Sequence, residues 1–186
     1  MKLKVLSWNV CGLNDAGKRE TLKSLLYKWK ADVICLQETK IEDWSNRLAL
    51  QVWGNRWTVW AELKSCGNNW GEGGIILWDK RQWSCSGIQQ GSYTISCMLD
   101  DLQENFTWCF TGVYGPHTNS EREVFWSELA AIRGLWSDHW VVGGDFNVCR
   151  FESEKYNCIR RSKAMSRFSD IIQDLGIIDL PIQGAF

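Results

Sequence analysis

Nearly continuous apolar runs, separated by helix-like segments, sharply limit the folds open to this chain. Residues 4–10, 32–37 and 140–144 are such runs. A strand with one exposed face would alternate apolar and polar residues, whereas a strand covered on both faces is apolar throughout. The pattern therefore predicts buried strands that lie between other layers of structure.

Apolar residues in other segments recur three and four positions apart, which is the spacing of an amphipathic helix. The helices that we predict, including one short helix, cover residues 17–30, 42–52, 119–136 and 164–176. Ser120 and Glu123 are expected to form a capping box at the start of the third helix. Gly176 is expected to end the fourth, because glycine readily adopts the left-handed conformation found just after a helix.

The middle of the chain reads differently, with five strand candidates and little helix between them. These candidates cover residues 56–63, 73–79, 82–90, 92–100 and 105–115. A run of this kind suggests hairpins in an antiparallel or mixed sheet. Residues 177–180 are expected to begin a further strand. Helices outside and two β-rich halves inside predict a layered α/β sandwich.

Length and composition indicate one globular domain. The chain has 186 residues, of which 45% are apolar and 23% charged, values typical of a folded domain with a real core. No apolar run approaches the roughly 20 residues that a membrane helix needs. The N-terminus lacks the apolar core of a signal peptide. We therefore expect a nuclear or cytoplasmic protein with no membrane partner.

Cysteine and charge patterns exclude some classes of site. None of the eight cysteines forms a CxxC pair and only two histidines exist, so a zinc finger or knuckle is not expected. Free thiols in apolar runs fit a reducing compartment. The formal net charge of −1 is not the signature of a general nucleic-acid binder. If the substrate is DNA, local cations and a metal ion must attract it.

Thirteen tryptophans exceed normal usage. Four of them lie in apolar runs and are expected in the core: Trp8, Trp78, Trp108 and Trp140. Four others have polar neighbours in the sequence: Trp44, Trp53, Trp70 and Trp83. The second group can serve either as core packing or as stacking surfaces for nucleic acid.

Polar residues recur at the C-terminal ends of the buried strands. Asn9 closes the first, Glu38 follows the second, and Tyr114 closes the third. Asp145 and Asn147 follow the fourth. Sheets of this type build sites at strand ends, because strands fix position and loops give access. A carboxylate such as Glu38 suits a hard cation such as Mg²⁺, and the two asparagines can donate hydrogen bonds to phosphate.

Each of these residues also has a simpler interpretation. Asn9 and Asn147 are common turn residues, Glu38 can be a charge at a helix start, and Tyr114 can be a core aromatic. The recurrence of such residues at four strand ends in succession favours the site over four separate coincidences.

Four motifs carry a family resemblance: LSWNVCGLN, ICLQETK, GVYGPH and GGDFNV. Together they resemble the endonuclease/exonuclease/phosphatase superfamily, and most of all the endonuclease domain of plant LINE-type (non-LTR) retrotransposons. The likeness runs from residue 3 onward. It implies a four-layer, DNase I-like sandwich of two mixed sheets packed face to face, with Mg²⁺ or Mn²⁺ as cofactor and DNA as substrate. A reverse transcriptase region would be the partner in a parent polyprotein.

The resemblance also implies roles for individual residues. Glu38 is the metal ligand and Asn9 its neighbour or co-ligand. Tyr114 contacts the scissile phosphate. Asp145 orients or deprotonates the attacking water, with Asn147 beside it.

Two departures from the family pattern affect the expected activity. His117 stands where the family has asparagine after the YGP sequence, and a histidine can still donate a hydrogen bond to phosphate. The family pattern also continues into last strands with a Ser-Asp-His motif, whereas this sequence stops at PIQGAF. We therefore expect an incomplete domain over residues 1–186 that hydrolyses DNA weakly or not at all.

An earlier Ser137-Asp138-His139 triplet does not replace the missing motif. It precedes the fourth strand, whereas Asp145 follows that strand. Six residues of extended chain span about 20 Å, far beyond the hydrogen-bond reach of about 3 Å that acid–base catalysis needs. We expect the triplet to be a solvated turn between helix and strand.

The sequence leaves three functional hypotheses open. The first is a metal-dependent DNA endonuclease that nicks one strand so that a reverse transcriptase can prime from the cut, by in-line attack of water on a phosphodiester. The second is a non-catalytic remnant of such a domain. The third is a relative that acts on abasic DNA or on a phosphorylated small molecule.

Overall fold

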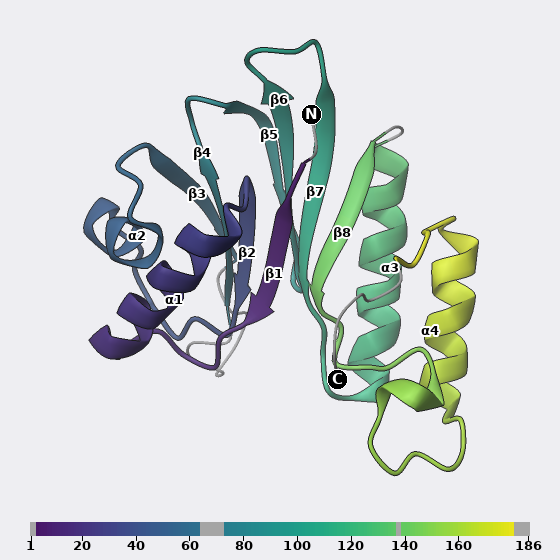
Figure 1. Cartoon of the computed structure of the whole chain (residues 1–186). Coiled ribbons are helices and arrows are strands. Elements are labelled where there is room, and N and C mark those ends of the chain that lie inside the picture. Colours follow the sequence, from purple (N-terminus) through teal and green to yellow (C-terminus); the bar gives the residue numbers. More distant parts are fainter. Residues whose placement is uncertain (1–2, 64–72, 137–138, 181–186) are drawn as a thin grey trace.

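The structure is a computed structural model that describes residues 3–63, 73–136 and 139–180. Within these ranges it contains eight strands, four α-helices and one 3-10 turn (Figure 1). The strands are β1 Val5–Asn9, β2 Val33–Gln37, β3 Thr58–Leu63, β4 Gly74–Asp79, β5 Trp83–Gln90, β6 Thr94–Asp101, β7 Thr107–Tyr114 and β8 Trp140–Asp145. The helices are α1 Ala16–Trp29, α2 Asn46–Trp53, α3 Asn119–Leu135 and α4 Lys163–Asp174, and the 3-10 turn is Glu152–Glu154.

The strands form two mixed sheets of four. One has the order β1-β2-β4-β3 and the other the order β5-β6-β7-β8. Each contains one parallel pair, β1 with β2 and β7 with β8, and its other pairs are antiparallel. Helices α1 and α3 make the two crossovers that parallel neighbours require. All eight predicted strands of the two sheets are therefore confirmed. The expectation that β1 and β8 are buried on both faces is wrong: β2 is buried throughout, whereas β1 and β8 are only partly buried, because each is the outermost strand of its sheet.

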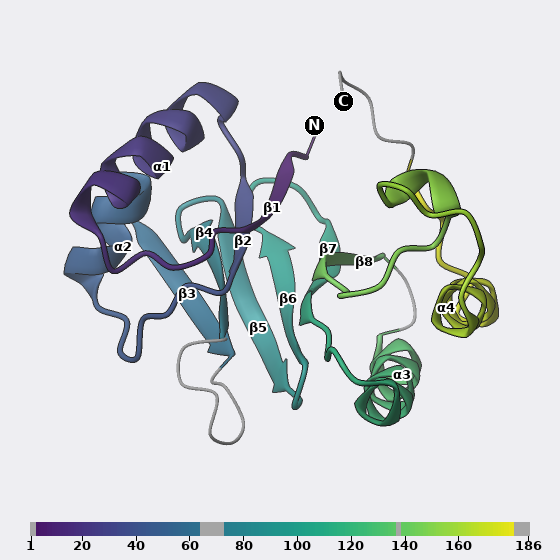
Figure 2. The same cartoon turned by 90° about the horizontal axis from the view of Figure 1, so that it is seen from below.

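Figure 2 shows the helices packed on the outer sides of the two sheets, in four layers. Three apolar cores hold these layers together. The first lies between the sheets and includes Cys35 and Trp78 from one sheet and Trp108 and Phe110 from the other. The second joins α1 and α2 to the outer face of the β1–β4 sheet. The third joins α3 and α4 to the outer face of the β5–β8 sheet. The expected four-layer α/β sandwich is thereby confirmed. The two sheets remain separate, because no described strand of one pairs with a strand of the other.

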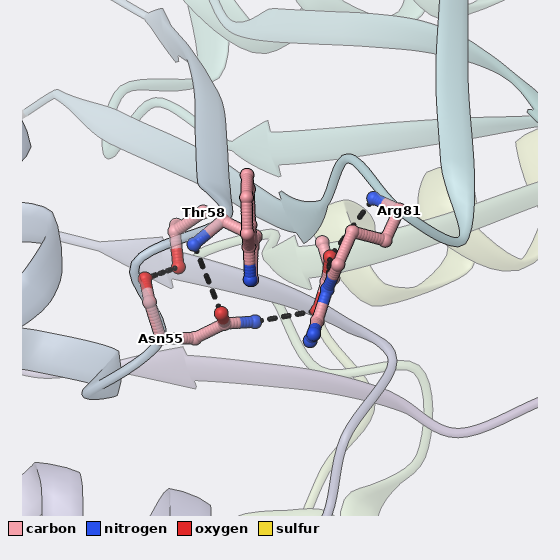
Figure 3. A network of polar contacts seen from close by, with 5 residues as sticks. Asn55, Thr58 and Arg81 are labelled. Carbon is pink, nitrogen blue, oxygen red and sulfur yellow. Dashed lines mark hydrogen bonds and ion pairs between the residues drawn. The ribbon is translucent and has the colours of Figure 1, made fainter.

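The end of the β1–β4 sheet remote from the C-termini of β1 and β2 is closed by polar contacts (Figure 3). Asn55 donates to the carboxylate of Asp79 at 2.6 Å, and Arg81 donates to the same carboxylate through Nη2 at 2.6 Å. The Thr58 hydroxyl donates to the carbonyl oxygen of Asn55 at 2.7 Å. These bonds fix the start of β3 against the end of β4.

Two expectations about element ends are wrong. Residues 177–180 form no strand, because no neighbouring strand pairs with them and their side chains at Ile178 and Leu180 are exposed. Helix α3 is capped by Thr118 rather than by Ser120: the Thr118 hydroxyl accepts from the backbone N–H of Glu121 at 3.3 Å. Gly176 does follow α4 with a positive φ of 65°, as expected.

The tryptophans divide differently from the expectation. Trp78 and Trp108 are buried as expected, and Trp140 is half-buried with its indole N–H donated to Thr111. Trp8 is 38% exposed, because β1 is the outermost strand of its sheet, and its ring lies 5.7 Å from that of Trp29. The expectation of a core position for Trp8 is therefore wrong.

The tryptophans with polar neighbours also have defined places. Trp83 is 1% exposed and packs edge-on against Trp108, so it belongs to the core and offers no stacking surface. Trp44 and Trp53 are partly buried against the core beneath α1 and α2. Trp70 lies outside the described residues. No helix in the described ranges combines the length and apolarity of a membrane span.

Candidate functional site

The topology brings the C-terminal ends of four strands to one side of the molecule. In each parallel pair the strand ends are in register, with Asn9 opposite Gln37 and Tyr114 opposite Asp145. Strands β1 and β8 also contact each other across the sandwich, and both end at the lower side in Figure 1. Residues at the ends of these strands can therefore meet although they come from different sheets.

The side chain of Asn9 bridges two carboxylates at this place. Its amide nitrogen donates to Glu38 Oε1 at 2.8 Å and to Asp145 Oδ2 at 2.9 Å. All three residues are partly buried. The two carboxylates therefore face one another across a single amide nitrogen, although Asp145 lies 136 positions from Asn9 in the sequence.

The orientation of the Asn9 amide is fixed from its other side. Its Oδ1 accepts from the backbone N–H of Cys11 at 3.1 Å and from the Cys11 thiol at 3.5 Å. Asn9 thus presents N–H groups, rather than its oxygen, to the space between the carboxylates. Its role as a direct metal ligand stays a prediction.

Tyr114 completes the contacts of Glu38. The phenol oxygen donates to Glu38 Oε1 at 3.1 Å. Tyr114 is the last residue of β7 and is half-buried. The structure therefore brings together the carboxylate, amide and phenol groups that the strand ends predicted.

Asp145 is held by the loop that follows it. Its Oδ1 accepts from the backbone N–H of Asn147 at 2.9 Å, and its carbonyl oxygen accepts from Gly115 at 2.7 Å. The side-chain nitrogen of Asn147 donates to the Gly115 carbonyl at 2.6 Å. One Asn147 donor thus binds the protein, where we expected this side chain to serve the phosphate.

The backbone around the site is conformationally unusual. Cys11, Glu38, Lys40 and Asn147 have φ between 47° and 55°. Asparagine tolerates this left-handed region, but residues such as Glu and Lys adopt it at a cost of about 1 kcal/mol or more. Backbone hydrogen bonds hold the conformation, including those from Gly12 and Leu13 to the carbonyls of Glu38 and Thr39. Such outliers gather at functional sites.

A buried, hydrogen-bonded side chain lies next to Glu38 and supports the site. Gln37 is buried directly before Glu38, and its side-chain nitrogen donates to Ser7 Oγ and Cys35 Sγ, both at 3.0 Å. Burial raises the pKa of the Cys35 thiol to about 12, although hydrogen bonds with Gln37 and Ser7 act in the opposite direction. Cys35 is therefore neutral in the folded protein at ordinary pH.

The two histidines occupy very different places. His117 is exposed in the loop between β7 and α3, three residues after Tyr114. The carbonyl of His139 accepts from Cys109 at 2.7 Å and its ring packs on Phe106. Since β8 runs from Trp140 to Asp145, His139 and Asp145 lie at opposite ends of that strand, as expected. Ser137 and Asp138 lie outside the described residues.

Besides the Cys11 thiol, sequence reasoning missed the side chain of Arg122, which contacts the site. Arg122 of α3 donates through Nη2 to the carbonyl oxygen of Asn147 at 2.8 Å. It lies four residues into the helix, near the positive end of the helix dipole, where a cation is unfavourable. A cation at this unfavourable position was the feature of the sequence that could have pointed to a role for Arg122.

The donor set fits a magnesium ion held with few protein ligands. The described residues contain no group of three or more His, Cys, Asp or Glu side chains that could hold a metal ion. Mg²⁺ is often bound by one or two carboxylates, with water and substrate phosphate completing its coordination. Glu38 supplies one such oxygen ligand, and Asp145 places a second carboxylate beside the same space. Oxygen ligands of this kind also suit Mn²⁺.

Solved structures of known proteins share this fold. The endonuclease domain of TRAS1, a telomere-specific non-LTR retrotransposon, superposes with a TM-score of 0.66 and 13% identity, covering 94% of this chain and 72% of that one. A mannosyl-6-phosphatase of Bacteroides thetaiotaomicron VPI-5482 has a TM-score of 0.61 and 14% identity, covering 79% and 66%. The human nocturnin catalytic domain has a TM-score of 0.59 and 17% identity, covering 79% and 64%.

Sequence comparison identifies the family. An exodeoxyribonuclease of Bacillus subtilis (strain 168) is 49% identical over 41 residues, which is 22% of this chain and only 16% of that protein. The Endonuclease/Exonuclease/phosphatase family matches residues 6–175, nearly the whole chain. The chain belongs to the Endonuclease/Exonuclease/phosphatase family.

Proposed function

We propose that the protein is a metal-dependent phosphodiesterase that nicks one strand of DNA. The observation that carries this proposal is the pair of carboxylates, Glu38 and Asp145, held together by the Asn9 amide at the junction of the two sheets. Oxygen ligands next to hydrogen-bond donors suit a hard cation and a phosphate group. The fold shared with the TRAS1 endonuclease domain supports DNA as the substrate.

The side chains of the site have separate roles in this proposal. Glu38 holds the metal, with Asn9 beside it. The Tyr114 hydroxyl and His117 donate hydrogen bonds to oxygens of the scissile phosphate. A bound Mg²⁺ would neutralise the charge that develops on those oxygens.

Asp145 acts on the attacking water. A carboxylate with one oxygen already bound by a backbone N–H has a fixed direction, so it can orient water opposite the leaving oxygen. The water oxygen forms a bond to phosphorus, its proton passes to Asp145, and the bond from phosphorus to the leaving oxygen breaks. The leaving oxygen takes a proton from solvent. The product is a nick, which a reverse transcriptase could use as a primer.

We expect the nicking rate to be low. The sequence has only two histidines, and His139 lies at the end of β8 remote from Asp145. His117 is thus the sole imidazole available to the phosphate. General acid–base assistance contributes typically 10²–10⁴-fold to such reactions, so a site with little of it reacts slowly.

A plasmid-nicking assay with Mg²⁺ and with Mn²⁺ tests the function. We expect slow conversion of supercoiled to open-circular DNA that Glu38→Gln and Asp145→Asn both abolish. Glu104→Gln is the matched control, because Glu104 is an exposed acid in the turn between β6 and β7. Nicking that survives Glu38→Gln would refute the assignment of this site.

Two other results would redirect the proposal. DNA binding without any nicking would favour the non-catalytic remnant. Hydrolysis of a phosphomonoester that depends on Glu38, without nicking of plasmid DNA, would favour a phosphatase.

A further inference from the structure

We propose that Arg122 is a positioning residue of the candidate site, which holds Asn147 and, through Asn147, orients the carboxylate of Asp145. The inference rests on the proposed function only in taking Asp145 as a reacting group. Arg122 lies in α3, in the helical layer that covers the β5–β8 sheet, and it reaches the loop after β8.

The guanidinium of Arg122 connects two segments. Its Nη2 donates to the carbonyl oxygen of Asn147 at 2.8 Å, and its Nη1 donates to Oδ1 of Asn119 at 2.7 Å. The Nε atom is buried without a hydrogen-bond partner. The planar fork of an arginine places its donors at fixed directions. Contacts on both arms therefore define where the Asn147 carbonyl lies relative to the start of α3.

Asn147 transmits this position to Asp145. Its backbone N–H donates to Asp145 Oδ1 at 2.9 Å and its side chain donates to Gly115 at 2.6 Å. Its φ of 51° turns the carbonyl toward Arg122 while the N–H points back to Asp145. One residue in a left-handed conformation is thus held at its N–H, its side chain and its carbonyl. The contact at the carbonyl comes from the cationic Arg122, opposite the Asp145 carboxylate that accepts from the N–H.

The guanidinium of Arg122 forms no ion pair with an acidic side chain among the described residues. Within the described residues the ion pairs of arginine join Arg81, Arg150 and Arg167 to acidic partners, and none involves Arg122. Its cost near the positive end of a helix is offset by the hydrogen bonds to Asn147 and Asn119. An arginine placed only to stabilise the helix would lie at the other end, as Arg133 does.

Hydrogen exchange measured on the whole chain tests the positioning role directly. We expect Arg122→Gln to speed amide exchange at residues 145–148 about tenfold, as for loss of one hydrogen bond to a charged group. Arg122→Lys should have an intermediate effect, because an ammonium can reach the Asn147 carbonyl without the fork. Arg133→Gln is the matched control: it removes a guanidinium that donates to the Trp136 carbonyl at 2.8 Å on the same helix.

Metal binding and kinetics extend the test to the site. Arg122→Gln should weaken Mn²⁺ binding, measured by calorimetry, and lower the single-turnover nicking rate about tenfold with little change in half-saturating DNA concentration. A direct phosphate contact would instead raise that concentration.

Several results would overturn the proposal. Exchange at residues 145–148 equal to wild type in Arg122→Gln would do so. Faster exchange spread over the whole β5–β8 sheet would show a merely structural role, and the milder Arg122→Lys variant would reveal the same pattern if Arg122→Gln failed to fold. If wild-type protein neither binds Mn²⁺ nor nicks DNA while the local exchange effect holds, the proposed function fails and the positioning role of Arg122 stands.

Discussion

Asn9 and Asp145 are separated by 136 positions in the sequence, yet the Asn9 amide nitrogen lies 2.9 Å from the Asp145 carboxylate. Asn9 ends a strand of one sheet and Asp145 ends a strand of the other. The hydrogen bond therefore crosses the sandwich at the candidate site. The same nitrogen also binds Glu38, so one side chain compensates two carboxylates that would otherwise repel each other.

Replacing Asn9 should expose that repulsion. We expect Asn9→Ala to lower the free energy of unfolding by about 1–3 kcal/mol in the absence of divalent cations, because partly buried carboxylates lose their donors. Added Mg²⁺ should stabilise Asn9→Ala more than wild type, since the cation can replace the lost donors. Thermal unfolding with and without Mg²⁺ measures both effects. Asn14→Ala, at an exposed loop position, is the control, and an equal Mg²⁺ effect on all three proteins would contradict the prediction.

Gly115 is a second position with a definite steric consequence. A Cβ there would clash with the carbonyl oxygen of Phe146, which belongs to the segment between Asp145 and Asn147. Gly115→Ala should therefore destabilise the protein by about 1–3 kcal/mol and weaken Mn²⁺ binding. Gly134→Ala is the control: a Cβ on this α3 glycine meets no atom within 4 Å, and it should stabilise by up to about 1 kcal/mol. Urea unfolding of both variants checks the signs, and similar effects at the two positions would refute the steric argument.

Thiol reactivity should differ among the cysteines of the two sheets. A hydrogen bond with Cys97 lowers the pKa of the half-buried Cys85 thiol to about 7, although burial opposes this. Burial raises the pKa of Cys109 to about 11 and that of Cys35 to about 12. Iodoacetamide should therefore modify Cys85 with a rate that rises through about pH 7, since the thiolate is the nucleophile, while Cys35 and Cys109 stay unmodified until the protein unfolds. Peptide mapping by mass spectrometry follows each site, and equal labelling of Cys85 and Cys35 in native protein would exclude this order.

Low pH should remove the contribution of Asp79 to the free energy of unfolding. Burial alone would raise the pKa of Asp79, but hydrogen bonds from Arg81 and Asn55 outweigh it and hold the pKa below its usual value of 3.8 (Figure 3). A carboxyl group with a lowered folded-state pKa stabilises the protein above its unfolded-state value, and this stabilisation is lost as the pH falls through the folded-state value. Asp79→Asn should thus destabilise the protein at pH 7, and by less near pH 3. Urea unfolding at the two pH values, with Asp43→Asn at an exposed position as control, tests this; a pH-independent difference would contradict it.

Local patterns in the sequence were sufficient to predict the layers and most elements. Continuous apolar runs identify strands, and a spacing of three and four identifies the helices that cover them. The same patterns failed where the outcome depended on distant neighbours. Trp8 lies in an apolar run but on an outermost strand, and residues 177–180 look like a strand but find no partner. At the start of α3, Thr118 and Ser120 are both capable caps, and their spacing alone does not decide between them.

At the candidate site, too, local patterns predicted some features, and others depended on distant neighbours. Strand ends predicted that Asn9, Glu38, Tyr114 and Asp145 would meet, because parallel strands place their C-terminal ends at one edge. The direction of each hydrogen bond was not predictable, since it depends on loop conformations such as the positive φ of Glu38 and Asn147. Arg122 was missed because its acceptor lies 25 residues away in a loop.

The partly exposed pair of Trp8 and Trp29 gives the protein a built-in optical reporter. Indoles in contact with water emit at longer wavelengths than buried ones such as Trp83 and Trp108, which are 1% and 2% exposed. Light at the red edge of the absorption band therefore excites a population enriched in the solvated pair. Because Trp8 directly precedes Asn9, a change in that emission on titration with Mn²⁺ or an oligonucleotide would record events at the end of β1 without any added label.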